Sequence, residues 1–312
     1  MNVRTITAIS VACILGLGCT QVKAAKPTLT GTLLFHRYPS YGSASEIWSY
    51  DFGSNTLVNI SAAWGLYDPI NGNWNPGKSQ ITFMAQAVQN GPWDVYLYTV
   101  SSGSLVNLTH GRQPRNEDPR FSPNGFRICY KETPASGPGQ LRIMDLTGAI
   151  TNTVTTSNVE HSMPCYTDDA TGLVYSRGVS PTDSIWQVNV GGTNDHSLSS
   201  GSKSYYPFVT GPSYYLYTKR TPSGHDQTYQ GNLSNSTITS MPYNNTGYDY
   251  SDAVSIPGTN YVIVSSDNPR LTGAVGGYDL YVANTSTGEL WNLNQYNAGI
   301  NGGKEELGAS FK

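Results

Sequence analysis

The amino-acid sequence predicts an all-β protein, a six-bladed β-propeller of four-stranded antiparallel blades. The 312 residues include only 12% charged residues but 22 tyrosines, 33 glycines and 18 prolines. This composition is typical of strands and turns, because the exposed faces of helices need Glu and Lys. A pattern of short strands also recurs six times, at intervals of about 45 residues. Finally, the chain ends with an unpaired copy of the opening strand of the pattern, as expected for a ring that closes on itself.

Within each repeat, the most regular element is a strand in which apolar and polar residues alternate, as a strand with two different faces requires. A turn of Gly, Ser, Thr or Asn and a short returning strand follow most copies. The alternating strands are predicted at Glu46–Asp51, Asp94–Thr99, Gln140–Asp145, Ser184–Asn189, Gln227–Asn232 and Asp279–Asn284. More continuously apolar strands precede them at Thr32–Tyr38, Gln80–Gln86, Phe126–Glu132, Gly172–Gly178, Tyr214–Arg220 and Tyr261–Asp267.

The opening strand of the repeat is irregular and ends in a tight turn, whose glycine accepts a positive φ. Its clearest copies are Asp118-Pro-Arg-Phe-Ser-Pro-Asn-Gly125 and Asn71-Gly-Asn-Trp-Asn-Pro-Gly77, and degenerate copies lie at 161–171, 205–213 and 250–260. The first repeat lacks this strand, while a spare copy, Glu306–Phe311, ends the chain. We therefore expect the C-terminal strand to complete the first blade and hide the sheet edges of an open array.

Residues 1–24 have the features of a signal peptide, with Arg4 before a mostly apolar run and a small-residue cleavage site at Ala24. The run is shorter than the roughly 20 residues of a membrane span. We predict a secreted or periplasmic protein with a signal peptide at 1–24 and one propeller domain at 25–312. A lipoprotein anchored at Cys19 is the less favoured alternative. A disulfide between Cys129 and Cys165 is left open, because buried thiols also pack unpaired in strands.

The third repeat resembles a known family. Residues 118–130, Asp-Pro-Arg-Phe-Ser-Pro-Asn-Gly-Phe-Arg-Ile-Cys-Tyr, followed by Leu-Arg-Ile-Met-Asp-Leu at 141–146, are similar to the WD40-like repeat of TolB-type propellers. In that family a Pro-x-Phe-Ser-Pro-Asp-Gly turn leads into two strands, and Asn124 replaces its Asp here. Repeat-level similarity extends over nearly all of 30–312, although the fourth and fifth repeats match poorly. The resemblance implies the fold and leaves the function open, because its relatives include an envelope scaffold, peptidase propeller domains and polysaccharide lyases.

The predicted topology distributes the loops over two faces. Turns between the first and second strands, and between the third and fourth, are short and nearly uncharged, which suits a structural underside. The crossovers between blades meet the loops between second and third strands on the opposite face, which we call the crossover face. These loops carry most of the ionisable and many aromatic side chains. Because binding residues concentrate on loops held by a rigid scaffold, we expect the crossover face to be the working face.

Candidate ligand-binding residues on the crossover face combine charged groups with aromatic rings. Arginine forks engage carboxylates, and aromatic faces stack on sugar rings. The candidates are His36, Arg37, Arg112, Arg115, Asp118, Arg177, Tyr206, Lys219, Arg220, Tyr250, Glu305 and Glu306. The alternative for each single residue is a structural role, in which it solvates a loop or bonds one blade to the next.

The sequence contains no Gly-x-Ser-x-Gly elbow, Walker loop, His-Glu-x-x-His or paired Cys-x-x-Cys motif. The best candidates for acid–base catalysis are His110 and His161, in successive crossovers, with Tyr205 nearby. One of these could remove a proton alpha to a uronate carboxylate held by Arg. No metal ligands are assigned, but convergence of three of the four histidines of the crossover face would favour a metal-dependent lyase. These four are His36, His110, His161 and His225.

The sequence favours a non-catalytic recognition module, a monomer that needs no cofactor and binds a glycan or an envelope or extracellular protein. Nucleic acid is excluded as a general partner because the net charge is −3 and the pI is near 5.9. The alternative is a polysaccharide lyase that acts on an acidic polysaccharide through the same face, with a divalent cation as candidate cofactor. A glycosidase is less favoured, since it needs two carboxylates roughly 5–10 Å apart. Whether the protein is an enzyme is left open.

Overall fold

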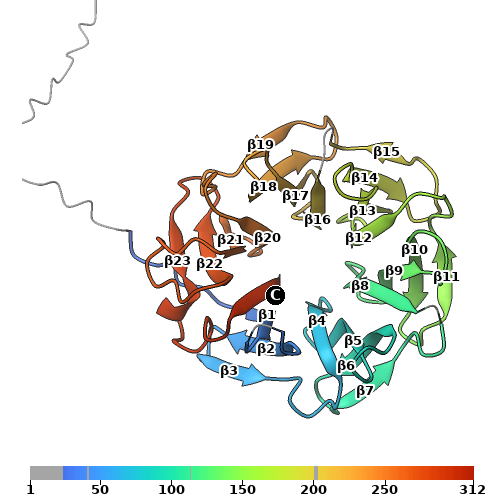
Figure 1. Cartoon of the computed structure of the whole chain (residues 1–312), viewed down its shortest axis with the longest axis horizontal. Coiled ribbons are helices and arrows are strands. Elements are labelled where there is room, and N and C mark those ends of the chain that lie inside the picture. The colour runs from blue at the N-terminus through green and yellow to red at the C-terminus, as the bar shows by residue number, and fades with distance from the viewer. Residues whose placement is uncertain (1–23, 41, 113, 200–202) are drawn as a thin grey trace, which may run out of the picture.

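A computed structural model describes residues 24–40, 42–112, 114–199 and 203–312. The predicted signal peptide, apart from its last residue, and Cys19 lie outside the described residues. The described chain consists of β-strands and one 3₁₀ turn, η1 (Leu293–Gln295). Antiparallel sheets are arranged in a ring around a central axis (Figure 1), which confirms the predicted β-propeller. Among these residues, no helix has the length and apolar character needed to cross a membrane.

Each blade has four strands, which follow one another from the axis outwards. The innermost strands are β24 (Glu305–Phe311), β4 (Tyr67–Trp74), β8 (Arg115–Phe121), β12 (His161–Tyr166), β16 (Ser204–Val209) and β20 (Tyr250–Ser255). The second strands are β1 (Thr32–Tyr38), β5 (Gln80–Gln86), β9 (Arg127–Thr133), β13 (Gly172–Arg177), β17 (Tyr214–Arg220) and β21 (Tyr261–Ser266).

The third and outermost strands complete the blades. The third strands are β2 (Glu46–Asp51), β6 (Trp93–Thr99), β10 (Gln140–Asp145), β14 (Ser184–Asn189), β18 (Asp226–Asn232) and β22 (Asp279–Asn284). The outermost strands are β3 (Thr56–Asn59), β7 (Ser104–Asn107), β11 (Ile150–Thr153), β15 (His196–Ser197), β19 (Ile238–Ser240) and β23 (Leu290–Asn292).

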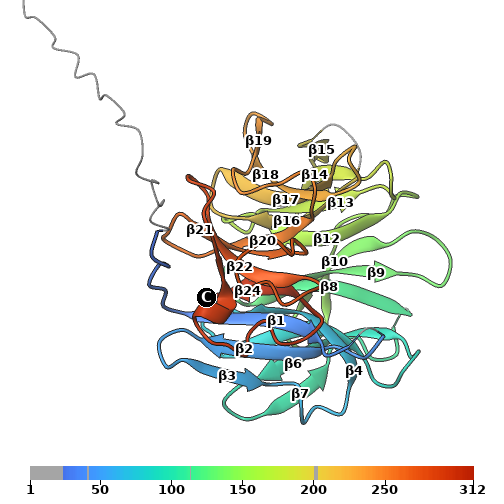
Figure 2. The ribbon, with the colours of Figure 1, turned by 60° about the vertical axis from the view of Figure 1, so that its left-hand side comes forward.

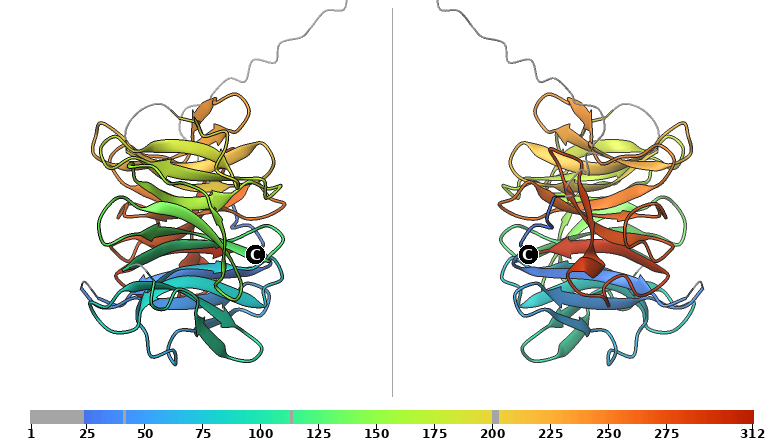
Figure 3. Two further views of the ribbon diagram at one scale, coloured as in Figure 1. Left: turned by 90° about the vertical axis from the view of Figure 1, so that its right-hand side faces the viewer. Right: turned by 90° about the vertical axis from the view of Figure 1, so that its left-hand side faces the viewer.

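Four of the sheets are separate four-stranded units, and the fifth sheet has eight strands. The eight-stranded sheet contains β4–β7 and β8–β11, which a single parallel bridge between Trp93 and Arg115 joins. We describe these two halves as separate blades, because each repeats the four-stranded pattern. Blade 1 is then β24-β1-β2-β3, and blades 2 to 6 follow in chain order. Figure 3 shows the ring edge-on, with loops projecting from its two faces.

The observed second and third strands lie within one residue of the predicted bounds. The innermost strands were less predictable: β4 begins at Tyr67 rather than Asn71, and β8 begins at Arg115 rather than Asp118. Their first residues are polar and do not alternate with apolar ones, because these strands face the axis and carry an irregularity described below.

The hydrophobic core consists of six clusters, each between two neighbouring blades. The period of two in a strand explains this arrangement. In β1, Leu33 and Phe35 pack against Ile263 of blade 6, whereas Leu34 between them packs against Phe83 of blade 2. Both faces of each second strand are therefore buried, which is why these strands are continuously apolar in the sequence.

The C-terminal strand β24 pairs with β1 and completes blade 1, as predicted. Figure 2 shows β24 beside β1 at the join between the two ends of the chain. Phe311 and Ala309 of β24 also enter the cluster between blades 6 and 1. A buried ion pair reinforces the join, because Nε of Arg37 lies 3.0 Å from Oε1 of the fully buried Glu306.

We predict that Glu306→Ala lowers the free energy of unfolding by about 3–5 kcal/mol, because it leaves the buried Arg37 guanidinium without its counter-charge. Urea denaturation would measure the change. The double variant Arg37→Met/Glu306→Leu should recover much of the loss, since it buries no charge. Arg115→Ala is the matched control, because the Arg115–Glu117 pair is exposed on the arginine side and should contribute less than about 1 kcal/mol. An unchanged midpoint for Glu306→Ala would contradict this account.

Deletion of 306–312 should prevent formation of a stable monomer. The truncated chain exposes the edge of β1 and removes two side chains from the cluster between blades 6 and 1. Light scattering after size exclusion should detect aggregates or oligomers, and thermal denaturation should lose its cooperative transition. An equally stable monomer would refute closure by β24.

Candidate functional site

A β-bulge interrupts every innermost strand at an equivalent position. The register between the innermost and second strands shifts there in all six blades. The residue at each bulge has a left-handed φ between 51° and 61°; these residues are Asn71, Asp118, Met163, Tyr206, Asp252 and Gly308. Outside glycine, such a φ costs roughly 1–2 kcal/mol, and bulges change the direction of side chains. The bulges thus direct side chains of five blades towards the axis.

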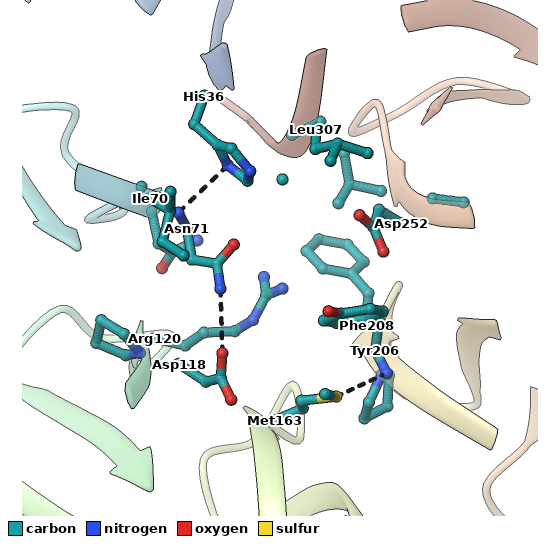
Figure 4. A pocket seen from close by; sticks show the side chains of 18 of the residues that line it. His36, Ile70, Asn71, Asp118, Arg120, Met163, Tyr206, Phe208, Asp252 and Leu307 are labelled. Atoms are coloured by element: carbon teal, nitrogen blue, oxygen red, sulfur yellow. Dashed lines mark hydrogen bonds between the residues drawn. The ribbon is translucent and has the colours of Figure 1, made fainter. Parts of the chain in front are cut away.

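The bulged residues line a chamber in the central channel (Figure 4). Its volume is about 190 Å³, and all six innermost strands contribute to its wall. One hydrogen bond on the wall joins blades 2 and 3, because Nδ2 of Asn71 donates to Oδ1 of Asp118 over 3.1 Å. The chamber is therefore a cavity within the ring whose wall combines polar and apolar side chains.

Blade 1 contributes a histidine from its second strand in place of a bulged side chain. A Cβ atom on Gly308 would lie 2.4 Å from Nδ1 of His36, so the imidazole occupies that space. The backbone N–H of Asn71 donates to Nδ1 over 3.4 Å, and burial lowers the pKa of His36 to about 3. A neutral imidazole that accepts at Nδ1 carries its proton on Nε2. His36 is 5% exposed, and its Nε2 has no hydrogen-bond partner among the described residues.

Two carboxyl groups lie on opposite walls of the chamber, Asp118 in blade 3 and Asp252 in blade 6 (Figure 4). Burial, and then repulsion by Glu117, raises the pKa of Asp118 to about 6. Burial, and then repulsion by Asp226, raises the pKa of Asp252 to about 7. Oδ1 of Asp252 has no hydrogen-bond partner in the described part of the chain. Burial thus makes the ionised form of both carboxyls energetically unfavourable.

Arg120 and Phe208 separate this chamber from the rest of the channel, because both also line the next cavity along the axis. The Arg120 guanidinium carbon lies 5.4 Å from the centre of the Phe208 ring. With the described residues, the Arg120 side chain forms neither an ion pair nor a hydrogen bond. It is therefore a half-buried cation with free donors.

The sequence predicts short, nearly uncharged turns on the face opposite the crossover face, but the structure also has a cavity there. The channel opens there into a second cavity of about 340 Å³. Aromatic side chains, among them Trp74, Phe121 and Tyr166, line it together with prolines of the short turns. Arg120, Asp168 and Lys312 also line it, so its wall combines polar and apolar groups, as that of the chamber does.

Most other candidate residues of the crossover face are paired with neighbouring side chains. Around blade 3, Lys131 bridges Glu117 at 3.2 Å and Glu160 at 2.7 Å, and Arg115 pairs with the same Glu117. Around blade 5, the Tyr205 hydroxyl donates to Asp226, which also pairs with Arg220 at 3.3 Å. Burial, and then the hydrogen bond to Asp226, raises the pKa of Tyr205. These residues join elements of the propeller to one another.

Further candidates also have partners within the fold. Arg177 pairs with Asp195 at 2.9 Å and stacks on Trp186, and Arg112 donates to the Tyr130 hydroxyl at 2.9 Å. The Tyr250 hydroxyl, in a side chain that is 1% exposed, accepts from Asn268.

Lys219 lies over the Tyr229 ring at 5.8 Å. Glu305 is half-buried at the start of β24, and Arg37 and Glu306 form the join described above. From the predicted set, the structure brings only His36, Asp118 and Tyr206 together in the chamber.

The histidines of the crossover face are dispersed. His36 lies in the channel wall, and His161 is 1% exposed, stacked on Tyr175 at 5.3 Å. Burial lowers the pKa of His161. His110 is exposed, and His225 pairs with Asp249 at 3.2 Å. Within the described ranges, no three His, Cys, Asp or Glu side chains form a group that could hold a metal ion. Both Cys129 and Cys165 are buried free thiols.

The sequence analysis missed Asn71, Arg120 and Asp252 as site residues. A regular spacing could have found the bulged positions, because in four blades each lies nine residues before the start of the second strand. These pairs are Asn71 and Gln80, Asp118 and Arg127, Met163 and Gly172, and Asp252 and Tyr261. Proline or a small residue follows each bulged residue, and proline inside an expected strand indicates a bulge.

Comparison with curated proteins finds limited similarity, and no family model matches the chain. The chain is 22% identical to dipeptidyl-peptidase 5 of Porphyromonas gingivalis over 175 residues, which are 52% of this chain and 25% of that protein. The chain thus spans about a quarter of the length of that relative.

Solved structures establish the fold more firmly. TolB from Acinetobacter baumannii has a TM-score of 0.66 at 14% identity, over 90% of this chain and 66% of that one. A TolB-type protein of Agrobacterium tumefaciens has a TM-score of 0.61 at 11% identity, over 85% and 89%. An oligogalacturonate lyase in complex with manganese has a TM-score of 0.53 at 15% identity, over 85% and 74%. The protein therefore has a TolB-like β-propeller fold.

Proposed function

We propose that this TolB-like propeller is a secreted or periplasmic recognition module for a glycan or an envelope or extracellular protein. The partner lies on the crossover face and places one projecting polar group in the central chamber. The observation that carries this proposal is the convergence of unsatisfied polar groups there. Arg120 has no ion-pair partner in the described chain, and Nε2 of His36 and Oδ1 of Asp252 have no hydrogen-bond partner there.

The contrast with the rest of the crossover face supports this location. On the crossover face outside the chamber, most arginines and lysines form ion pairs with carboxylates or stack on aromatic rings of the propeller itself. A ligand at those residues would have to break these contacts, whereas Arg120, Nε2 of His36 and Oδ1 of Asp252 have no such partners to lose among the described residues. Polar groups that are buried without partners are costly, and such local cost is a feature of functional sites.

The size of the chamber limits what can enter it. At about 190 Å³ it is smaller than the roughly 300–1,000 Å³ of typical small-molecule pockets. It therefore admits one end group or side chain, and the remainder of a polymer would rest on the exposed parts of the crossover face. Tyr206, which is 37% exposed, lies at this transition.

The lyase alternative has less support. The likeness to an oligogalacturonate lyase concerns the fold, and the candidate histidines do not converge. Incubation with acidic polysaccharides, followed by the absorbance of unsaturated uronides, tests this alternative directly. A rise that Asp118→Asn abolishes would favour the lyase over the binding module.

We predict that the protein is retained on an array of glycans and peptides, and that Asp118→Asn/Arg120→Gln reduces this retention at least tenfold. Both substitutions remove a charge from the chamber; asparagine keeps the shape of Asp118, and glutamine keeps a polar amide in place of the Arg120 guanidinium. Glu289→Gln/Arg127→Gln is the matched control, because these two residues are exposed and belong to the opposite face. Retention that the chamber variant leaves unchanged would contradict the proposed function.

We also predict that Asp252→Asn stabilises the protein relative to wild type as the pH rises from 4 to 8. A carboxyl whose folded pKa is raised from 3.8 to about 7 stabilises the fold below its ordinary pKa. It loses that contribution as the pH rises through 7. The asparagine variant lacks this loss, so the difference in free energy of unfolding should grow in its favour. Denaturant titrations at several pH values measure it, with Glu289→Gln expected to show no trend.

A further inference from the structure

The chamber contains formal charges of both signs that are not paired with one another. Arg120 and Asp118 lie two residues apart on β8 and both face the channel, and Asp252 faces them from β20 (Figure 4). The three groups are close enough to influence one another, since Arg120 lowers the pKa of both carboxyls. Yet Arg120 forms no ion pair with either of them.

Hydrogen-bond donors and acceptors both line the chamber. Nε2–H of His36 and the Arg120 guanidinium offer hydrogen to a ligand, whereas the carboxyls of Asp118 and Asp252 accept it. A simple cation would satisfy the carboxylates but would meet the Arg120 guanidinium. A simple anion would satisfy Arg120 but would be repelled by the carboxylates. A neutral ligand would add no charge to a chamber in which two carboxylates face one guanidinium, which is unfavourable when these groups are desolvated.

We propose that the chamber binds an α-amino-carboxylate group, that is, an ammonium and a carboxylate on one carbon atom. The ammonium lies between Asp118 and Asp252, and the carboxylate accepts from Arg120 and from Nε2–H of His36. The proposal rests on the proposed function, because it specifies which end group enters the chamber.

Size and burial agree with such a ligand. About 190 Å³ holds a small amino acid, and charge-assisted hydrogen bonds in a water-poor cavity are roughly twice as strong as neutral ones. The bulges hold Asp118 and Asp252 in the chamber wall before a ligand arrives, which reduces the ordering that binding requires. Two sources share this chemistry: a free amino acid, and an α-amino-carboxylate group at the end of a side chain of a larger partner.

Calorimetric titration at pH 8 tests the proposal with two probes. Alanine represents a free amino acid, and Nε-acetyl-lysine represents an α-amino-carboxylate group at the end of a longer side chain. N-acetyl-alanine lacks the ammonium and alaninamide lacks the carboxylate, so each should bind at least tenfold more weakly than alanine. Binding of alanine alone identifies a free amino acid as the ligand. Comparable or tighter binding of Nε-acetyl-lysine identifies the carried group.

The chamber variants provide the second arm. Asp252→Asn and Arg120→Gln should each weaken binding of the bound probe at least tenfold, while Glu289→Gln and Arg127→Gln leave it unchanged. Binding should also weaken from pH 8 to pH 5, as Asp118 and Asp252 take up protons. The charged and titratable groups that face these two carboxyls are Arg120 and Glu117 of β8, Lys131 of β9, His36 of β1, Asp226 of β18 and Tyr206 of β16.

Three results would overturn the proposal: equal binding of N-acetyl-alanine or alaninamide, unchanged binding in both chamber variants, or no binding of either amino-acid probe at millimolar concentration. The array experiment separates this failure from failure of the proposed function. If neither probe binds but retention on the array still depends on Asp118 and Arg120, the recognition module stands and only the α-amino-carboxylate ligand is wrong.

Discussion

Burial of both faces of each second strand is the constraint on which the architecture depends. Side chains that alternate along β1 enter two different hydrophobic clusters, one shared with blade 6 and one with blade 2. The same holds around the ring, so no blade can bury its apolar residues alone. Closure of the ring gives every blade two neighbours against which to bury its faces, and β24 provides closure by pairing with β1 while Arg37 and Glu306 form a buried ion pair beside it.

Closure also fixes what happens at the axis. The innermost strands converge there, and a regular strand would direct alternate side chains into its neighbours. The bulges relieve this crowding and turn one residue per blade towards the channel. The propeller thus buries its apolar surface between blades and places charged side chains at its centre. The packing between blades offsets the unfavourable free energy of the left-handed residues.

The sequence predicts the fold well because the residues that define the repeat specify strands and turns through local preferences. Apolar runs such as 80–86 and the turn at 122–125 specify strands and reversals without reference to distant partners. The chamber was harder to predict. His36, Asp118 and Tyr206 were identified, but Asn71 and Asp252 gain significance only from the backbone bulges that place them in the wall of the chamber. Many rim residues with binding chemistry, including Arg115 and Arg220, are engaged with carboxylates of the propeller, and sequence alone cannot distinguish such pairs from free groups.

Gly308 makes one wall of the channel different from the other five. Five bulges carry side chains of four different kinds, and the sixth carries none, so that an imidazole from the adjacent strand reaches the axis instead. In a channel with six identical walls, a ligand could bind in six equivalent orientations. Acids lie on two facing walls, Asp118 in blade 3 and Asp252 in blade 6, and His36 enters from blade 1, so the walls of the channel are chemically different. The blades repeat around the ring, but the side chains that line its centre do not share the rotational symmetry of the backbone.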